Sequence, residues 1–203
     1  MISNSTEKFK TECFVTGLYV RAEGSSYTSR VGELTLDLQG IVHESTRNSK
    51  YRGFTRTSDR RVPWLPIDTE IRNQRQISML SVEDLDALAV SLGISKIDPE
   101  WLNANFLISG LEDFSSLPRG TRMRLPNGGC ILVEDRTYPC RGSGAAVKEF
   151  YPHRSNLELE FVAAAATLRG LLCTIELGGN VVEGDRLEVL VPKQWIWTPE
   201  RGR

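Results

Sequence analysis

Short apolar segments separated by glycine turns constrain the fold more than any other feature of this sequence. Strand-length apolar runs occupy residues 12–22, 32–42, 105–111, 121–135 and 171–191. In the second run Leu34, Leu36 and Leu38 alternate with polar residues, which is the period of a half-buried strand. The stretches "PNGG" and "LGGN" are typical hairpin loops. The pattern predicts a mainly β (α+β) chain, folded as a closed β-barrel with a few peripheral helices.

One amphipathic helix is expected to follow Ser81, which is a good N-cap residue. Asp84 stands at the position of a capping-box partner, and Gly93 is the expected stop. The apolar stripe consists of Leu85, Leu88, Ala89 and Leu92. A second, shorter helix is predicted over residues 160–169, because this stretch is rich in alanine and ends at Gly170.

The composition is that of an ordinary globular protein. The 203 residues predict a single domain, 1–203, and the net charge of −1 provides no general attraction to nucleic acid or anionic membranes. No apolar run approaches the roughly 18 residues of a membrane span, and the polar first ten residues lack the apolar core of a secretory signal. We therefore expect a cytoplasmic protein with neither a nucleic-acid nor a membrane partner.

The four cysteines are dispersed. Cys13, Cys130, Cys140 and Cys173 show no C-x-x-C spacing, so a clustered zinc or iron–sulfur site is not expected. In a cytoplasmic chain they are predicted to be reduced thiols. The two histidines are too few for a histidine-rich metal site.

Cys140 has the most distinctive surroundings of the four, in the stretch "TYPCRG". Pro139 stiffens the chain before it, Arg141 carries a positive charge beside it, and Gly142 gives the backbone room. A thiolate on a rigid turn beside a cation suits a soft-metal ligand or a sulfur acceptor. Local chemistry alone leaves this interpretation open against that of a structural cysteine.

Residues 47–75 form the strongest electrostatic feature. Eight basic residues stand against three acidic ones in this irregular segment, a local net charge of +5 in a nearly neutral chain. The segment is either a solvated surface or an anion pocket, since arginine forks match phosphate oxygens. Asn73, between Arg72 and Arg75, adds a neutral donor.

An ordered set of motifs resembles the MOSC domain, the module named from the C-terminal part of molybdenum cofactor sulfurases. The set begins with residues 71–111, "IRNQRQISMLSVEDLDALAVSLGISKIDPEWLNANFLISGL", and continues with "LPRGTRMRL", "YPCR", "LRGL" and "GGNVVEGDRLEVLVP". It covers residues 31–193, with 194–203 as a C-terminal tail. The resemblance implies a MOSC-type closed β-barrel.

The same resemblance implies roles for particular residues. The single characteristic cysteine of the family falls on Cys140, which would ligate molybdenum as the catalytic residue or carry a persulfide sulfur. Contacts to the molybdenum cofactor (molybdopterin) are implied at Arg56, Arg61, Arg72, Arg75, Asn105, Arg169 and Gly170. Asn73 and Arg141 join this cofactor-binding set through their local chemistry.

Three functions follow as alternatives. The first is a molybdenum-dependent oxidoreductase that acts on N-oxygenated or similar small-molecule substrates. It would need a separate electron-transfer reductase, because the sequence has no iron–sulfur cysteine set and no G-x-G-x-x-G fingerprint. The second is a non-redox sulfur carrier or cofactor-binding module that uses a Cys140 persulfide. The third is a barrel that has lost its site, since the segment around His43 and the asparagine Asn103 depart from the family pattern.

Overall fold

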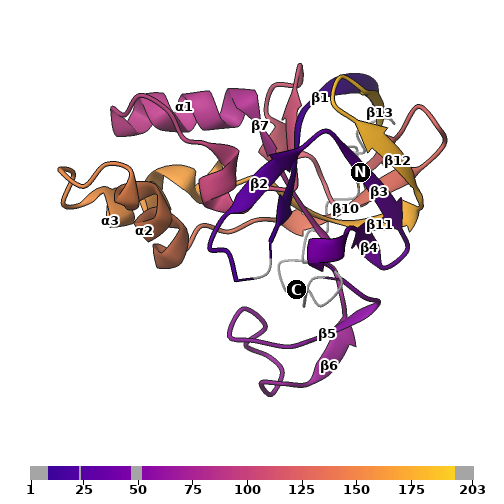
Figure 1. The fold of residues 1–203 in the computed structure, drawn as a ribbon, viewed down its shortest axis with the longest axis horizontal. Helices are drawn as coiled ribbons and strands as arrows, with labels where there is room; N and C mark the ends of the chain where they lie inside the picture. Colours follow the sequence, from indigo (N-terminus) through magenta and orange to yellow (C-terminus); the bar gives the residue numbers. More distant parts are fainter. Residues whose placement is uncertain (1–8, 23, 47–51, 195–203) are drawn as a thin grey trace, which may run out of the picture.

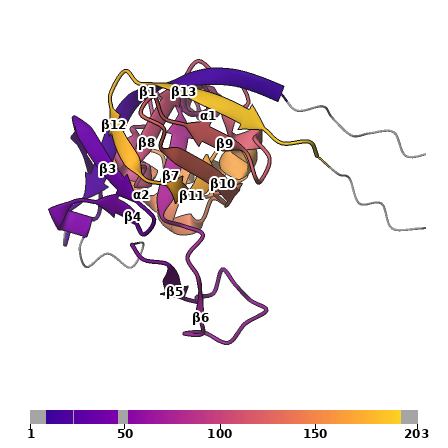
Figure 2. The ribbon, with the colours of Figure 1, turned by 90° about the vertical axis from the view of Figure 1, so that its right-hand side faces the viewer.

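A computed structural model of the chain describes residues 9–22, 24–46 and 52–194. Its centre is a closed, mixed β-barrel of seven strands, seen as a ring in Figure 2. In hydrogen-bonded order the strands are β13 (Arg186–Val191), β9 (Arg122–Arg124), β10 (Cys130–Arg136), β11 (Leu171–Leu177), β7 (Ile77–Ser81), β8 (Phe106–Ser109) and β1 (Phe9–Arg21). Pairing of β1 with β13 closes the ring. The predicted mainly β, α+β barrel is confirmed.

The long strand β1 pairs with three other strands. Its first half pairs with β13, and its second half pairs with β2 (Thr28–Val31) on the same edge. On its other edge β1 pairs with β8, with a register shift between Val15 and Gly17. The neighbouring pair β7 and β8 is parallel, and helix α1 (Val82–Leu92) lies between these two strands in the chain. A helical crossover of this kind is what a parallel pair requires.

Two smaller β units flank the barrel. The first is a three-stranded sheet in the order β12 (Gly179–Val182), β3 (Glu33–Asp37) and β4 (Gly40–Val42). The single strand predicted over 32–42 is therefore a hairpin, because Gly40 adopts a φ of 118° that an extended strand does not allow. The second unit is the hairpin of β5 (Thr55–Thr57) and β6 (Glu70–Arg72), which projects below the barrel in Figures 1 and 2. It lies in the predicted irregular basic segment, of which residues 47–51 are outside the described part.

Helix α1 confirms the prediction from the apolar stripe. The Ser81 side chain accepts a hydrogen bond from the Asp84 N–H, and Gly93 ends the helix with a left-handed φ of 60°. Asp84 differs from the expected capping-box partner. Its buried carboxylate instead accepts hydrogen bonds from the backbone and hydroxyl of Ser115, so it attaches α1 to the short helix η3 (Phe114–Ser116).

The other helices lie beside α1 on one side of the barrel, as Figure 1 shows. They are α2 (Arg141–Glu149) and α3 (Leu157–Ala164), with the 3-10 turns η2 (Pro99–Leu102) and η4 (Ala165–Thr167). Another 3-10 turn, η1 (Glu44–Thr46), follows β4 away from these helices (Figure 1). The sequence pattern does not predict α2, because two glycines in its first turn weaken the helical signal. Helix α3 begins before the predicted range of 160–169 and ends inside it, at Ala164, where the 3-10 turn η4 continues the chain. Among the described residues, no helix is long and apolar enough to cross a membrane.

Two apolar cores occupy opposite sides of strand β7. Met79 points into the barrel, where it joins a cluster with Phe106 and Ile131. The next residue, Leu80, points outward into a second cluster that packs the helices and includes Leu88 and Phe161. Successive strand residues face opposite sides of a sheet, so one strand contributes to both cores. The barrel and its helical layer are packed through these shared strands.

Gly170 lies at the closest backbone contact between the barrel and the segment that enters β11. Its φ is 82°, and a β-carbon at this position would overlap the carbonyl oxygen of Met79. Its N–H donates to Ser115 Oγ at 2.8 Å, and its carbonyl accepts from the Thr137 N–H at 2.8 Å. Gly170 is thus required by backbone packing.

We expect Gly170→Ala to destabilise the protein far more than Gly184→Ala. Both glycines have positive φ, 82° and 93°, but a β-carbon at Gly184 would meet nothing within 4 Å. The strained φ alone costs about 1 kcal/mol, whereas the added overlap at Gly170 brings the loss to roughly 4 kcal/mol or more. Urea denaturation of the two variants measures the difference. Equal losses would show that the contact with Met79 relaxes without cost.

Candidate functional site

Cys140 lies at the start of helix α2, where it is exposed. It has extended backbone angles and is the N-cap residue, so the predicted rigid turn is the beginning of a helix. The Ser143 Oγ accepts from the Cys140 N–H at 3.0 Å, and the Ser143 backbone N–H faces the Cys140 sulfur. The exposed N–H groups of a helix N-terminus carry partial positive charge, which favours an anion such as a thiolate.

The glycines after Cys140 have different roles. A β-carbon at Gly144 would overlap the backbone oxygen of Glu158, so this glycine allows α2 to pack against α3. A β-carbon at Gly142 would lie 3.7 Å from the Cys140 sulfur, an ordinary van der Waals contact. Close approach of the two helices, rather than of a ligand, therefore explains Gly144.

The cation that acts on Cys140 comes from another part of the chain. Arg169 is 7% exposed, and its Nη2 donates to the Leu102 carbonyl at 2.9 Å. Its buried Nε and Nη1 atoms have no hydrogen-bond partner among the described residues. The adjacent Arg141, expected beside the sulfur, instead forms an ion pair with Glu158 at 2.8 Å.

The surroundings lower the pKa of the Cys140 thiol below its ordinary value. Burial of the sulfur opposes ionisation, but hydrogen bonding from Ser143 and Gly142 and the charge of Arg169 outweigh it. In return, burial lowers the pKa of Arg169 to about 10, and the charge of Cys140 opposes that shift. The buried Arg169 guanidinium and the Cys140 sulfur thus interact, and the positive charge favours the thiolate form.

The other cysteines are buried and remain protonated. Burial raises the pKa of Cys13 to about 12 and that of Cys130 to about 11, and it also raises the pKa of Cys173. Cys173 and Met79 are in contact inside the barrel, with sulfur atoms 3.5 Å apart. Among the four cysteines, Cys140 alone has the exposure and the lowered pKa of a reactive thiol.

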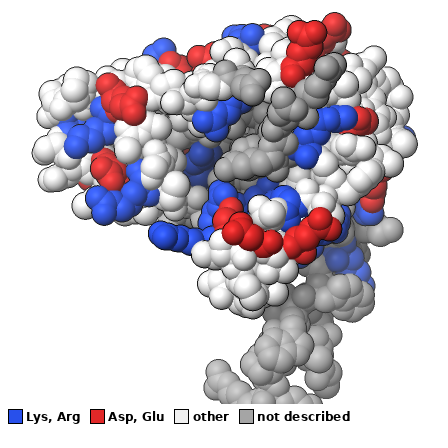
Figure 3. Space-filling view, turned by 60° about the horizontal axis from the view of Figure 1, so that its bottom comes forward, with Lys and Arg blue, Asp and Glu red and all other residues white. Residues whose placement is uncertain are grey.

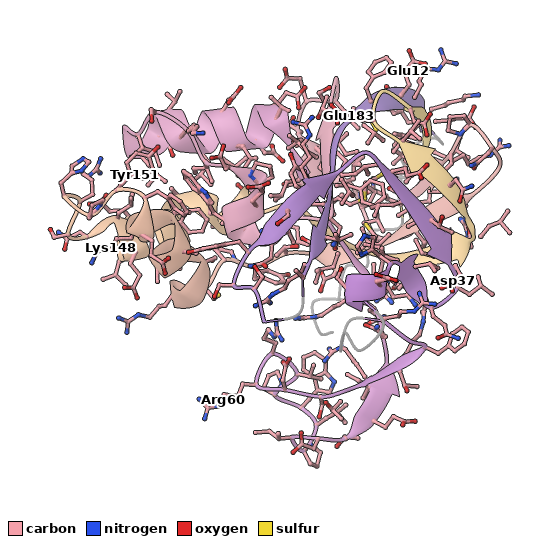
Figure 4. The ribbon with its side chains drawn as sticks, in the orientation of Figure 1. Glu12, Asp37, Arg60, Lys148, Tyr151 and Glu183 are labelled. Carbon is pink, nitrogen blue, oxygen red and sulfur yellow. The ribbon has the colours of Figure 1, made fainter. Side chains whose placement is uncertain are left out.

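Four predicted cofactor-binding arginines line one pocket, which we name the arginine pocket. Its volume is about 260 Å³, and its lining residues are Arg56, Arg61, Val62, Trp64, Leu65, Ile71, Arg72, Gln74, Arg75, Asp135 and Leu172. It lies between the β5–β6 hairpin and the barrel strands β10 and β11. Figure 3 shows Lys and Arg side chains gathered where the hairpin meets the barrel. Arg60, from the same basic segment, points outward from the hairpin in Figure 4.

Acidic side chains already hold part of this positive charge. Asp59 lies 3.9 Å from Arg56 and forms an ion pair with Arg61, which holds the pKa of the Asp59 carboxyl well below its usual range. Asp135 is the single carboxylate among the lining residues of the described pocket. The lining side chains therefore carry a net positive charge, as expected of an anion pocket.

The β10–β11 ladder connects the arginine pocket to Cys140. Asp135 and Leu172, which line the pocket, are paired across this ladder. The ladder ends at the hydrogen bond from the Thr137 N–H to the Gly170 carbonyl. At about 3.3 Å per residue, this end lies roughly 7 Å along the strands from the pocket wall. Cys140 follows this end by three residues and Arg169 directly precedes it, so the ladder that contributes Asp135 and Leu172 to the pocket also leads to Cys140 and Arg169.

Three other predicted residues have structural contacts. Asn105 accepts from the Ser78 N–H at 3.0 Å and donates to the Tyr19 carbonyl at 3.3 Å, so its amide joins neighbouring barrel strands. Asn73 donates to the Gly53 carbonyl and accepts from the Arg75 N–H, which fixes the base of the hairpin. With Gly170, described above, they shape the site, and the structure shows their side chains or backbone engaged within the protein.

The two departures from the family pattern are readily located. Asn103 adopts a left-handed φ of 54°, a conformation that asparagine tolerates better than most residues. Its Oδ1 atom is buried without a hydrogen-bond partner among the described residues, next to the Leu102 carbonyl that Arg169 contacts. His43 bonds Ser45 through Nδ1 at 2.8 Å and lines a separate depression with Val42, Glu44 and Arg52.

Glu134 is a residue of the site that the sequence pattern does not predict. Its buried carboxylate pairs with Arg72 at 2.5 Å and with Arg119 at 3.0 Å. In the sequence it ends the apolar run "CILVE", where an acidic residue is expected at a strand end facing solvent. Nothing in the local pattern signals a buried carboxylate at this position.

A profile of the MOSC domain family matches residues 66–188. YuaD of Bacillus subtilis (strain 168), which its name assigns provisionally to metal–sulfur cluster biosynthesis, is 36% identical over 173 residues, 85% of this chain and 88% of that protein. The crystal structure of YuaD from Bacillus subtilis aligns with a TM-score of 0.86 at 33% identity, over 92% of this chain and 100% of that chain. YiiM from Geobacillus stearothermophilus aligns with a TM-score of 0.57 at 13% identity, over 89% and 75% of the two chains, and shares the fold alone.

We expect Cys140 to be the one thiol that iodoacetamide alkylates rapidly near neutral pH, with a rate midpoint below the ordinary cysteine pKa of about 8.5. Replacement Arg169→Met removes the charge that favours the thiolate, so the midpoint should rise. The control Arg141→Met should leave it unchanged, because Arg141 pairs with Glu158. Rates measured across pH by mass spectrometry test this, and an unchanged midpoint in Arg169→Met would contradict the assigned role of Arg169.

Proposed function

Because the chain belongs to the MOSC domain family, we propose that it binds the molybdenum cofactor through the Cys140 thiolate and acts as an oxidoreductase on N-oxygenated small molecules. The main support for this proposal is that a thiol of lowered pKa and an arginine pocket both adjoin the β10–β11 ladder. A cofactor with a soft metal at one end and a phosphate at the other needs both chemistries.

The residues present fit such a group. A thiolate is a ligand that soft metals prefer, and guanidinium groups match phosphate oxygens in bidentate fashion. The buried Nε and Nη1 atoms of Arg169 are donors without partners in the described structure. A buried unpaired cation is costly, so an anionic group at Cys140 would compensate for its burial.

Bound molybdenum would supply the two-electron oxygen-atom chemistry, and the protein would supply position and charge. Cys140 would hold the metal, while Arg169 and the N-terminus of α2 keep its sulfur ionised. Arg56, Arg61, Arg72 and Arg75 would orient the phosphate. The exposure of Cys140 leaves room for a small substrate beside the sulfur.

Electrons for this reaction would come from a separate reductase, which we place with this protein in the cytoplasm. The sequence carries neither an iron–sulfur cysteine set nor a dinucleotide-binding fingerprint. A reductase would therefore have to dock on the face that bears Cys140.

A second function is favoured by the exposure of Cys140 and by the name of the relative YuaD. In this alternative Cys140 is a sulfur carrier. Its thiolate would attack the outer sulfur of a donor protein's persulfide, the donor thiolate would leave, and Cys140 would hold the new persulfide for transfer. The lowered pKa of Cys140 serves this nucleophilic role equally well.

The two functions differ in what the purified protein carries. Prepared from a host that makes the cofactor, the wild-type protein should contain near-stoichiometric molybdenum, and Cys140→Ser should lose it. Cys130→Ala is the matched control, because Cys130 is buried in the barrel wall and should retain the metal. Elemental mass spectrometry measures both.

Absence of molybdenum from the wild-type protein would refute the molybdenum proposal. A labile sulfur addition on Cys140, seen by intact-protein mass spectrometry and removed by dithiothreitol, would then support the carrier function. A protein with neither group would indicate a barrel whose site is no longer used.

A further inference from the structure

Glu134 is a buried carboxylate between the arginine pocket and the barrel wall. It lies on β10 and is 3% exposed. The register of the β10–β11 pair shifts between Val133 and Asp135, so Glu134 occupies an irregular, bulged position. Such bulges re-aim a side chain out of the normal alternation of a strand. Here the carboxylate meets side chains from three other segments of the chain.

Four donors occupy the two oxygens of Glu134. Oε1 accepts from Arg72 Nη2 at 2.5 Å and from Thr174 Oγ1 at 3.0 Å. Oε2 accepts from Gln74 Nε2 at 3.2 Å and from Arg119 Nη2 at 3.0 Å. Thr174 belongs to β11, whereas Arg72 and Gln74 belong to the hairpin and the segment that follows it. The carboxylate therefore joins the barrel to the base of the hairpin.

Two of these donors, Arg72 and Gln74, also line the arginine pocket. The Arg72 side chain is 62% exposed, while that of Glu134 is 2% exposed. The ion pair thus fixes the Arg72 guanidinium on the side that faces the protein and leaves its other side open to solvent. An arginine fixed in this way has already lost much of its rotamer freedom, so less entropy is lost when it binds a ligand.

We propose that Glu134 is a positioning residue, which holds Arg72 and Gln74 in place for the phosphate of an anionic ligand in the arginine pocket. The proposal deepens the proposed function and rests on it to the extent that the pocket takes a phosphate. Glu134 would thus support the binding of an anion, although the anion itself would repel its carboxylate.

A positioning role and a purely electrostatic role of Glu134 predict opposite changes in anion affinity. Neutralising an acidic residue beside an anion pocket makes the local potential more positive, which by itself strengthens anion binding. Loss of a positioning residue instead frees Arg72 and Gln74 and weakens binding. The two effects predict opposite changes for one substitution, Glu134→Gln.

The test measures the affinity for inorganic pyrophosphate by isothermal titration calorimetry at fixed ionic strength. We expect Glu134→Gln to bind pyrophosphate about tenfold more weakly than the wild-type protein, as for the loss of one charge-assisted contact. Arg72→Met should weaken binding by a similar factor, and the double variant should be no weaker than Arg72→Met alone, since Glu134 acts through Arg72. Circular dichroism establishes that each variant is folded.

Three further variants serve as controls. Asp135→Asn neutralises a pocket carboxylate that accepts from the Arg136 backbone N–H and forms no ion pair within the described part of the chain, so it should tighten pyrophosphate binding. Glu176→Gln breaks an ion pair between β11 and Arg122 of β9, across β10 and outside the pocket lining, so it should leave the affinity unchanged. Thr174→Val removes one donor to Glu134 without changing charge, and it should weaken binding roughly threefold. If Glu134→Gln does not fold, Thr174→Val carries the test.

Pyrophosphate binding by Glu134→Gln as tight as wild type, or tighter, would overturn the assignment, as would an unchanged affinity in Thr174→Val. A wild-type protein that binds no pyrophosphate would overturn both the phosphate role of the pocket and that of Glu134. A wild-type protein that binds pyrophosphate but carries no molybdenum would refute the proposed function and leave the assignment of Glu134 supported by its own variants.

Discussion

The candidate site depends on the antiparallel pairing of β10 with β11. This ladder places Cys140, which follows β10, near Arg169, which precedes β11, although 29 positions separate them in the chain. One end of the ladder is set by the bond from the Thr137 N–H to the Gly170 carbonyl, and its outer face forms a wall of the arginine pocket. Barrel closure by β1 and β13 keeps these strands rigid, because a closed sheet has no free edge. Cys140 and the arginine pocket can therefore hold a fixed separation, as the proposed cofactor site requires.

Two buried charged residues at this ladder, Glu134 and Arg169, differ in how fully their polar atoms are hydrogen-bonded. Glu134 has four hydrogen-bond donors for its two oxygens, so its burial is compensated within the protein. Within the described residues, Arg169 has one backbone acceptor and two buried nitrogen atoms without a partner, and burial lowers its pKa to about 10. An incompletely satisfied buried cation beside a reactive thiol is a feature of functional sites, where stability is reduced in favour of ligand binding. This difference agrees with the two proposals, in which Cys140 reacts and Glu134 positions the arginine pocket.

The sequence predicts those helices and strands that are specified by residues close together in the chain. The cap at Ser81, the apolar stripe and the stop at Gly93 specify α1, and the structure shows each of them. Most barrel strands also lie within the predicted runs. Helix α2 was not predicted, since Gly142 and Gly144 disfavour a helix unless tertiary packing requires them, and the requirement comes from the backbone of α3. The strand predicted over 32–42 failed for a related reason, because alternation does not reveal the turn at Gly40.

The sequence by itself determined the barrel class, the capped helix and the clustering of arginines, because these are carried by residue type and spacing, and its resemblance to the MOSC domain singled out Cys140. Tertiary structure alone decided which cation acts on Cys140. Arg141 is adjacent in sequence but bonds Glu158, while the distant Arg169 is buried beside the thiol. It also decided that Asn73 and Asn105 bond the backbone, and that Glu134 supports the arginine pocket. The physical reason is that burial and hydrogen-bond partners arise from segments far apart in the chain, and a charge acts on what lies near it in space.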